Sequence, residues 1–465
     1  MKMVKSLVLG SAAGLLALSA GAQAADLPLK AKAVEYVKVC SLYGAGFYYI
    51  PGTDTCIKIG GYVFAETGFH SIANTMMPAW GGPWTRNSNE LMSRSRFGLQ
   101  VDTRTATEYG VVRTYFNGTY TWTTNGSARA GGELGVYHAF VQFAGFTFGK
   151  AVSVFSPPWN GGPGSNITSY LIGGDDTGTG VNQVAYTAQF GNGVSASIAL
   201  EESSGLIPVA TGSPLNSYRR APIYVAALDA AGNTILANVP WGGTNAPDIV
   251  GAIKLDQAWG MVQLSAAAHQ IRANALVPIS DTWGFAVQGA LTLKNLPTGP
   301  GDTINLSAGY TDGASRYLIG GVSPDTYQIW DGGTFAARGL SNDAVIVVDA
   351  AGNLSYQKTS AWGLRGAFNH NWDPYWATSV YGSYTAVTHT GAVKAALGWN
   401  PDFAISQIGV NVRWTPVKNL TFTGEALYTH LDQNVTGATY SGIAAGAIAR
   451  DTGTWTFGVR AMRTF

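Results

Sequence analysis

Short segments that alternate apolar and polar side chains recur along most of the chain. In residues 93–102, Phe97 and Leu99 alternate with Arg96 and Gln100. This period of two is typical of β-strands with one apolar face, so the sequence predicts an all-β fold. Alternation alone does not decide between a transmembrane barrel and a soluble sandwich, in which the polar face would simply face water.

The connections between these segments alternate between brief turns and long loops. The predicted strands lie at residues 57–70, 93–103, 107–122, 132–143, 145–153, 181–190, 193–201, 249–256, 259–271, 282–294, 302–311, 360–370, 374–386, 404–414, 419–431 and 452–465. The long connections lie near 71–92, 154–180, 202–248, 312–359, 387–403 and 432–451, and shorter ones near 123–131 and 272–281. Short turns at one end and long loops at the other are typical of outer-membrane β-barrels. An even number of strands places both chain ends on the periplasmic side. We expect no separate domain in the long loops.

The composition limits what surrounds this sheet. Charged residues make up 12% of the chain, against about 25% in a typical soluble protein. Beyond the N-terminal segment, no apolar run reaches the roughly 18 residues of a membrane-spanning helix, which excludes a helical membrane protein. Aromatic residues gather at predicted strand ends, as in interfacial girdles, although they could also be core residues of a sandwich. They are Trp122, Phe143, Phe146, Trp259, Trp283, Tyr375, Trp376, Trp414 and Trp455.

The N-terminus resembles a secretory signal peptide. Lys2 and Lys5 precede an apolar stretch at residues 7–20 and a small-residue site that ends at Ala24. We expect cleavage there, because the stretch is shorter than the roughly 20 residues of a membrane anchor. Residues 1–24 are then the signal peptide, and the basic count falls from 28 to 26 against 27 acids, a net charge of −1. No nucleic-acid partner is indicated.

The chain has two cysteines, Cys40 and Cys56. In a secreted chain two nearby cysteines favour a disulfide over a pair of reduced thiols, and a metal site would need more ligands close by. We therefore divide the mature chain into a periplasmic N-terminal segment at 25–56, closed by this disulfide, and a barrel at 57–465.

No sequence pattern indicates catalysis. The six histidines form no H-E-x-x-H pair, and no G-x-S-x-G motif occurs. Gly178 and Gly180 lack the third glycine and the following helix of a nucleotide-binding loop. We therefore expect no enzymatic activity, no metal and no cofactor. Because some outer-membrane barrels are hydrolases, a catalytic dyad across the lumen stays an alternative.

Residues 34–40, 43–56 and 59–63 resemble the mature N-terminus of alphaproteobacterial outer-membrane porins. The resemblance implies a general diffusion porin, with a sixteen-stranded barrel, a homotrimer surrounded by outer-membrane lipid, and a third external loop folded into the lumen. Residues 455–465 are similar to the aromatic-ended last strand that the barrel assembly machinery recognises in this family. Loops 202–248 and 312–359 vary between members, so no function is carried over to them.

The expected constriction loop is 154–180, since tandem prolines at Pro157 and Pro158 and nearby glycines allow it to turn inward. The alternative is an ordinary external loop. Asp175 and Asp176 would supply the acidic side of a transverse field across the pore. The basic side would come from strand residues of lumen-facing parity, because arginine at the bilayer midplane costs about 2–4 kcal/mol. These are Arg94, Arg96, Arg113, Arg365, Arg413 and Arg460, with Lys58 and Lys254 as weaker candidates.

Four functions compete at this point. The leading one is passive diffusion of small hydrophilic solutes and ions through a water-filled barrel. A second is a substrate-specific channel with a saturable lumen site, using aromatic residues such as Trp159 and Tyr170. A third is a closed barrel that acts as an adhesin or anchor, although an eight-stranded anchor would need only about half this length. A soluble β-sandwich or propeller is the fourth.

Overall fold

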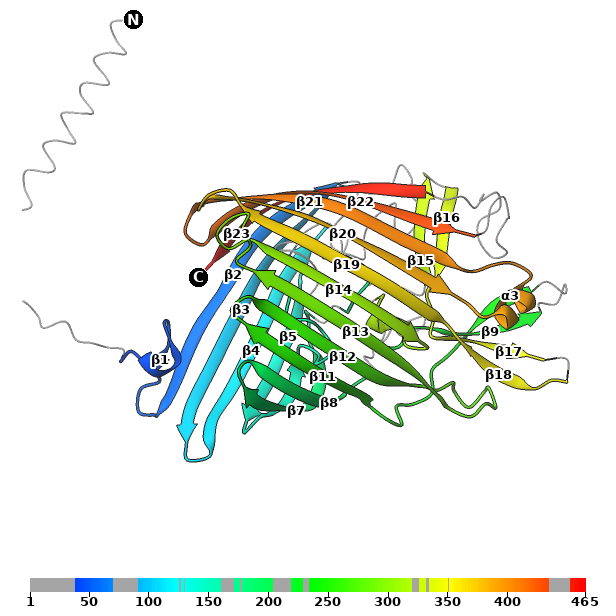
Figure 1. The fold of residues 1–465 in the computed structure, drawn as a ribbon, viewed down its shortest axis with the longest axis horizontal. Coiled ribbons are helices and arrows are strands. Elements are labelled where there is room, and N and C mark those ends of the chain that lie inside the picture. The colour runs from blue at the N-terminus through cyan, green and yellow to red at the C-terminus, as the bar shows by residue number, and fades with distance from the viewer. Residues whose placement is uncertain are drawn as a thin grey trace, which may run out of the picture.

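The computed structural model describes residues 38–69, 91–124, 127–128, 130–159, 171–175, 178–203, 219–228, 234–319, 326–331, 334–349, 351–434 and 452–465. Sixteen antiparallel strands form a closed barrel (Figure 1). They are β2 (Thr55–Phe69), β3 (Leu91–Thr107), β4 (Gly110–Thr123), β5 (Glu133–Phe143), β6 (Phe146–Ala151), β7 (Val181–Gly191), β8 (Val194–Glu201), β11 (Asp248–Gln257), β12 (Gly260–Ile271), β13 (Thr282–Lys294), β14 (Thr303–Asp312), β19 (Ser360–Asn371), β20 (Trp376–Thr388), β21 (Phe403–Val417), β22 (Leu420–Gln433) and β23 (Thr452–Thr464).

Each barrel strand pairs with its neighbour along the chain, and the first strand closes the sheet by pairing with the last. In this closing pair, Tyr62 of β2 lies opposite Thr464 of β23. The backbone N–H of Phe465 also donates to the Gly61 carbonyl, at 3.1 Å. Closure leaves no open edge in the barrel wall, which is the requirement for a sheet that spans a bilayer. The sixteen predicted strands are confirmed, most within three residues at either end.

The two faces of the wall have opposite chemistry. Large apolar side chains on the outer face are exposed; for example, Ile253 and Leu264 are 62% and 63% exposed. The alternate positions carry polar side chains that face inward and are buried, such as Gln288, Gln407 and Thr456. This pattern is the inverse of a soluble protein and fits lipid outside and polar contents inside. The predicted transmembrane barrel is therefore confirmed, and the alternative of a soluble sandwich is wrong.

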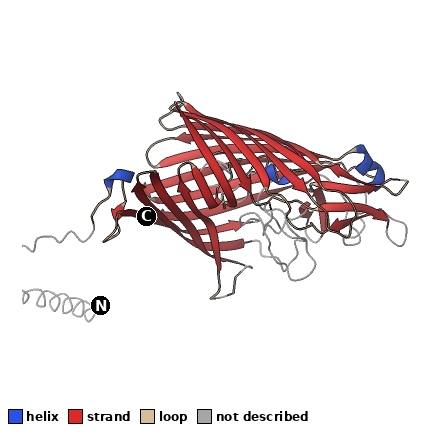
Figure 2. Cartoon of the chain, turned by 90° about the horizontal axis from the view of Figure 1, so that it is seen from below, coloured by secondary structure: helices blue, strands red, loops and turns tan. Residues whose placement is uncertain are grey.

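The short turns lie at one end of the barrel. At the β7–β8 turn, Gly191, Asn192 and Gly193 all have positive φ angles, of 83°, 49° and 76°. A Cβ on Gly193 would lie 1.9 Å from the Asp256 carbonyl oxygen, so the turn needs glycine there. In Figure 1, β1 (Tyr48–Tyr49) and the C-terminus lie at this end, opposite α3 (Gly391–Leu397). Figure 2 shows the 3-10 helix η1 (Ser41–Tyr43) and α3 at opposite ends of the barrel.

Three of the long loops carry secondary structure that the sequence analysis did not predict: α3 lies in loop 387–403, and loops 202–248 and 312–359 contain strands. The strands β9 (Ile223–Leu228), β10 (Thr234–Val239), β17 (Ala344–Val348) and β18 (Leu354–Lys358) form a four-stranded sheet. Its central pair, β9 and β17, is parallel and joins the two loops. A separate hairpin consists of β15 (Thr326–Asp331) and β16 (Thr334–Leu340), and η2 (Ser315–Tyr317) follows β14. These strands are only five to seven residues long, so local alternation does not identify them, and the β9–β17 pairing joins segments that lie far apart in the sequence. No helix in the described part of the chain is long and apolar enough to cross a membrane.

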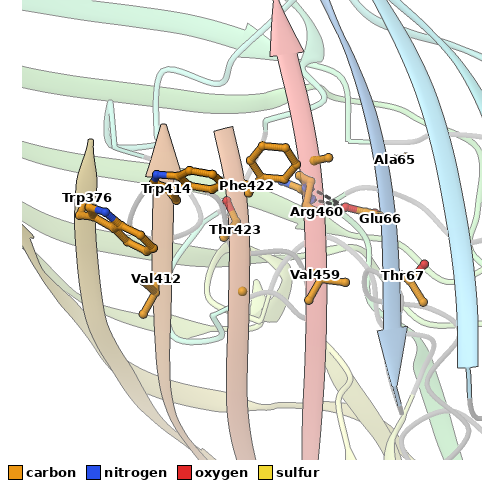
Figure 3. Close-up of a pocket in the computed structure, with 12 residues that line it drawn as sticks. Ala65, Glu66, Thr67, Trp376, Val412, Trp414, Phe422, Thr423, Val459 and Arg460 are labelled. Carbon is orange, nitrogen blue, oxygen red and sulfur yellow. Dashed lines mark hydrogen bonds and ion pairs between the residues drawn. The ribbon is translucent and has the colours of Figure 1, made fainter. Parts of the chain in front are cut away.

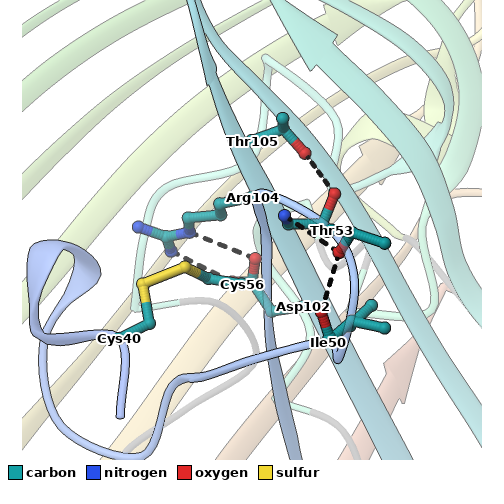
Figure 4. Close-up of a disulfide and its surroundings, with 8 residues drawn as sticks. Cys40, Ile50, Thr53, Cys56, Asp102, Arg104 and Thr105 are labelled. Carbon is teal, nitrogen blue, oxygen red and sulfur yellow. Dashed lines mark hydrogen bonds and ion pairs between the residues drawn. A yellow bond between two sulfur atoms is a disulfide. The ribbon is translucent and has the colours of Figure 1, made fainter. Parts of the chain in front are cut away.

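The predicted Cys40–Cys56 disulfide is confirmed, and both sulfurs are buried at the short-turn end (Figure 4). The loop that it closes packs Phe47 against the barrel. Arg104 of β3 lies over this ring, with its guanidinium carbon 4.9 Å from the ring centroid. The N-terminal segment is thus attached to the barrel wall by a covalent bond and by a cation–π contact. The predicted signal peptide, residues 1–24, lies outside the described residues.

Candidate functional site

Charged side chains follow one cross-strand register on the inner wall. Arg94 of β3 lies opposite Glu66 of β2, which in turn lies opposite Arg460 of β23. Arg460 lies opposite Thr423 of β22, and Thr423 opposite Arg413 of β21. Arg94 and Arg460 both donate to Glu66, and the Arg460 Nε to Oε2 distance is 2.6 Å. Figure 3 shows Glu66, Arg460 and Thr423 on these neighbouring strands. One carboxylate is therefore shared by two guanidinium groups.

An aromatic ring supports three of these arginines. The guanidinium carbons of Arg94, Arg96 and Arg460 lie 5.5, 5.4 and 4.7 Å from the ring centroid of Phe64. Cation–π contacts of this kind orient a guanidinium without neutralising its charge. Arg96 shares the lumen-facing parity of Arg94, two residues away on β3. We call Arg94, Arg96, Arg413 and Arg460 the arginine row.

Two arginines of the row, Arg96 and Arg413, contact neutral groups. Arg96 Nε donates to Thr121 Oγ1 at 2.8 Å, and its guanidinium lies 5.4 Å from the Tyr137 ring centroid. Arg413 Nη2 donates to Ser379 Oγ at 3.2 Å, and its buried Nε has no hydrogen-bond partner among the residues that the structure describes. No carboxylate of the described residues forms an ion pair with either side chain.

Arg113 belongs to a different cluster at the short-turn end. Its Nη2 lies 2.9 Å from Asp102 Oδ2, and Arg104 Nη2 lies 3.0 Å from the same oxygen. A further hydrogen bond joins Arg113 Nη1 to Gln142 Oε1, at 3.0 Å. The structure does not bring Arg113 together with Asp175, and a carboxylate partly compensates its charge.

The described parts of loop 154–180 pack against the inner wall of the barrel. Phe155 is 1% exposed and contacts inward-facing alanines of β7, β8, β12 and β13. Leu171 contacts Ala367, Tyr381 and Leu427 on β19, β20 and β22. The backbone N–H of Ile172 donates to Gln407 Oε1 of β21, at 2.7 Å. Apolar side chains and hydrogen bonds therefore attach the loop to the wall both before Pro157 and Pro158 and after residue 170. Residues 160–170 lie outside the described part of the chain.

Arg365 of β19 holds the loop where it passes that strand. Its Nη2 donates to the Asp175 carbonyl at 2.6 Å, and its Nη1 to the Leu171 carbonyl at 3.4 Å. The guanidinium lies 4.9 Å from the centroid of the Trp159 ring. Since its side chain is almost completely buried under the loop, Arg365 binds the loop and does not face the water column.

Asp175 is also fully buried, which differs from its expected place on the acidic side of the pore. Its carboxylate pairs with Arg219, at 2.5 Å between Oδ1 and Nη1, and accepts a short hydrogen bond from the Ser156 hydroxyl. The Asp175 N–H donates to Gln288 Oε1 of β13, at 3.1 Å. Burial between these partners makes Asp175 an attachment point of the loop. Asp176 lies outside the described residues.

Arg219 connects three separate parts of the chain. Besides Asp175, it reaches Glu201 at the end of β8, with Nη2 3.3 Å from Oε2. The face of its guanidinium stacks on Tyr317 of η2, 3.9 Å from the ring centroid. The Glu201 carboxylate accepts a second hydrogen bond from the Ser153 hydroxyl, at 2.7 Å. Loops 154–180, 202–248 and 312–359 therefore meet at one buried guanidinium.

The buried network continues through Tyr317. Its hydroxyl donates to Asp248 Oδ2 at 2.7 Å, and burial raises the pKa of this phenol well above its ordinary value. Asp248 Oδ1 lies 2.8 Å from His269 Nδ1, and His269 Nε2 lies 3.6 Å from Asp343 Oδ2. Asp343 accepts hydrogen bonds from the backbone N–H groups of Ala221 and Ser315. We call this network, from Asp175 through Arg219 and Tyr317 to Asp343, the loop hub.

Sequence reasoning did not identify the loop hub. The sequence does offer one signal, because adjacent arginines at 219 and 220 precede an apolar run in a loop that is otherwise poor in charge. Of the weaker candidates, Lys58 Nζ lies 5.9 Å from the Phe47 ring centroid, and Lys254 faces inward opposite Ser195. No group of metal-ligating side chains occurs in the described ranges. Tyr170 lies outside them.

Comparisons with known proteins agree with this architecture. A family model described as a porin subfamily matches residues 26–456. Porin Omp2b of Brucella suis is 31% identical over 311 residues, which cover 63% of this chain and 75% of the relative. Porin Omp2b of Brucella neotomae is 29% identical over 345 residues, covering 72% and 81%. The outer membrane channel DcaP of Acinetobacter baumannii shares the fold, with a TM-score of 0.60 and 16% identity over 90% of this chain and 99% of that one.

The closed barrel, its apolar outer face and these relatives lead to one conclusion. The chain belongs to the porin subfamily and is an outer-membrane channel for passive diffusion.

Proposed function

We propose that the channel is a general diffusion porin for small hydrophilic solutes and ions, narrowed by loop 154–180. The observation that carries the proposal is the attachment of this loop to the inner wall by Arg365 and Asp175, both buried inside the barrel. A loop held in this way occupies part of the lumen cross-section. Arg94, Arg96, Arg413 and Arg460 then line the remaining water-filled path, with Arg113 near its periplasmic exit.

The loop hub supports a constriction built from more than one loop. Because Arg219 and Tyr317 bring residues of loops 202–248 and 312–359 against Asp175, these loops help to fix the position of loop 154–180. We propose that the hub residues are positioning residues and that solutes do not contact them. A rigid constriction gives a steady, size-limited conductance.

We further propose that the protein is a homotrimer in outer-membrane lipid and is inserted by the barrel assembly machinery. The apolar outer face and the aromatic residues at strand ends support contact with lipid; Trp376 and Trp414, for example, stack 5.8 Å apart near the short-turn end. We assign no catalytic activity and no nucleic-acid partner to the chain. Residues 25–56 would form the periplasmic segment that the disulfide closes.

Conductance of the refolded protein in planar bilayers tests this proposal. A general diffusion porin gives stable, water-filled channels whose current is proportional to voltage, and its solute flux rises linearly with concentration. Flux that saturates at millimolar solute would instead support a substrate-specific channel. Correctly folded protein without conductance would support the adhesin or anchor and would contradict the diffusion channel.

A further inference from the structure

We infer that the channel prefers anions and that the arginine row provides this preference. The inference rests on the proposed diffusion function and names anions as the class of solute that the channel prefers. It starts from the imbalance of charge on one part of the inner wall. The row contains the guanidinium groups of Arg94, Arg96, Arg413 and Arg460, whereas the lumen-facing carboxylates beside it are Glu66 and Glu425.

The imbalance is not removed by ion pairing. Glu66 can compensate one of the two arginines that it binds, Arg94 and Arg460. Arg96 and Arg413 are bound only through neutral hydroxyls and aromatic rings within the described part of the chain. Each therefore carries a full positive charge that no carboxylate among the described residues cancels.

The register gives the row a direction along the pore. On a tilted sheet, the hydrogen-bonding direction runs obliquely down the wall. Arg413 lies four residues from the end of β21 at the short turns, whereas Arg94 lies three residues from the beginning of β3 at the long loops. The arginines therefore follow a sloping path between the two mouths and do not form a ring at a single depth. An anion can move from one guanidinium to the next along this path.

Accessibility favours the same conclusion. All four arginines are partly exposed, whereas Arg365 and Arg219 are buried beneath the loops. Fixed positive charge on the wall of a narrow path with low-dielectric sides raises the local concentration of anions and lowers that of cations. Phe64 keeps three guanidinium groups oriented without adding a compensating charge.

The test is the reversal potential of the refolded full-length mature protein under a potassium chloride gradient. We expect chloride to permeate at least about threefold better than potassium, and the ratio to fall toward one in the double variant Arg96→Gln/Arg413→Gln. The double variant Arg96→Lys/Arg413→Lys should keep most of the preference. The matched control is Lys418→Gln/Arg463→Gln, which removes two positive charges at the short-turn end outside the arginine row and should leave the ratio unchanged.

A further variant separates charge from structure. Glu66→Gln removes the carboxylate between Arg94 and Arg460 and should increase the chloride preference, whereas mere damage to the wall would reduce selectivity. Conducting wild-type channels with a ratio of one, or with potassium preferred, would overturn the anion inference and leave the diffusion channel intact. Absence of conductance would overturn both.

Discussion

Arg219 Nη1 lies 2.5 Å from Asp175 Oδ1, and neither side chain has any surface exposed to water. This ion pair joins a residue of loop 202–248 to loop 154–180, the proposed constriction. Burial of both charges is costly, and Glu201, Ser156 and Tyr317 offset part of that cost by contacting the two side chains. The position of the proposed constriction loop therefore depends on a residue of another loop.

Replacing Arg219 by methionine should loosen the attachment of loop 154–180, the proposed constriction. The variant leaves Asp175 and Glu201 buried without their cation, at a cost of about 3–5 kcal/mol to the loop hub. Because the barrel register is independent of this site, we expect folded channels with noisier current and faster protease cleavage in the loops. Single-channel recording and limited proteolysis measure both effects. The double variant Arg219→Met/Asp175→Asn should cost less than the sum of the two single changes, and strict additivity would contradict the coupling.

The sequence predicts the barrel well because each strand carries its own signal. In β13, for example, the predicted and observed bounds coincide at residues 282–294, since alternation and flanking turn residues are both local features. The loop hub has no such signal. Asp175 and Arg219 are 44 residues apart, and only the inward folding of two loops brings them together. For the same reason the sequence did not predict that Asp175 is buried. The position of a residue in a loop can be read from the sequence, but its burial beneath a second loop cannot.

The assignment of faces can be tested on two adjacent residues of β11. Ile253 points outward and is 62% exposed, whereas Ala252 points inward opposite Ser197. Ile253→Arg places a charge toward lipid and should destabilise the folded barrel by about 2–4 kcal/mol. Ala252→Arg is the matched control and should cost much less, because its side chain faces the polar interior. Urea unfolding in lipid vesicles gives both free energies, and equal losses would contradict the assignment.

Acid should weaken the β13–β14 turn through Asp302. The hydroxyl of Thr298 donates to this carboxylate, and the Asn371 N–H and His370 also bind it, so its pKa falls to about 2. A carboxyl group whose pKa is lower in the folded protein than in the unfolded chain stabilises the fold at pH values above the unfolded pKa, which is about 4. This contribution is lost as the pH falls toward the folded pKa of about 2. We expect Asp302→Asn to melt below the wild type at about pH 5 and at the same temperature near pH 2. Thermal melts at the two pH values measure this difference in melting temperature. If the variant melted below the wild type by the same amount at both pH values, the assignment to Asp302 would be contradicted.

The Cys40–Cys56 disulfide should hold the N-terminal segment and not the barrel. It closes a loop with a sequence separation of 16, for which chain entropy alone gives about 3 kcal/mol. In contrast, β2 remains paired with β3 and β23 whether or not the bond exists. In Cys40→Ser/Cys56→Ser we therefore expect proteases to remove the segment before residue 55 faster, while single-channel conductance stays within the wild-type range. Wild-type protein treated with a reductant is the control and should show the same cleavage together with a mobility shift on electrophoresis. Loss of the folded barrel in the variant would contradict this expectation. It would mean that the disulfide is needed for β2 to pair with its neighbours.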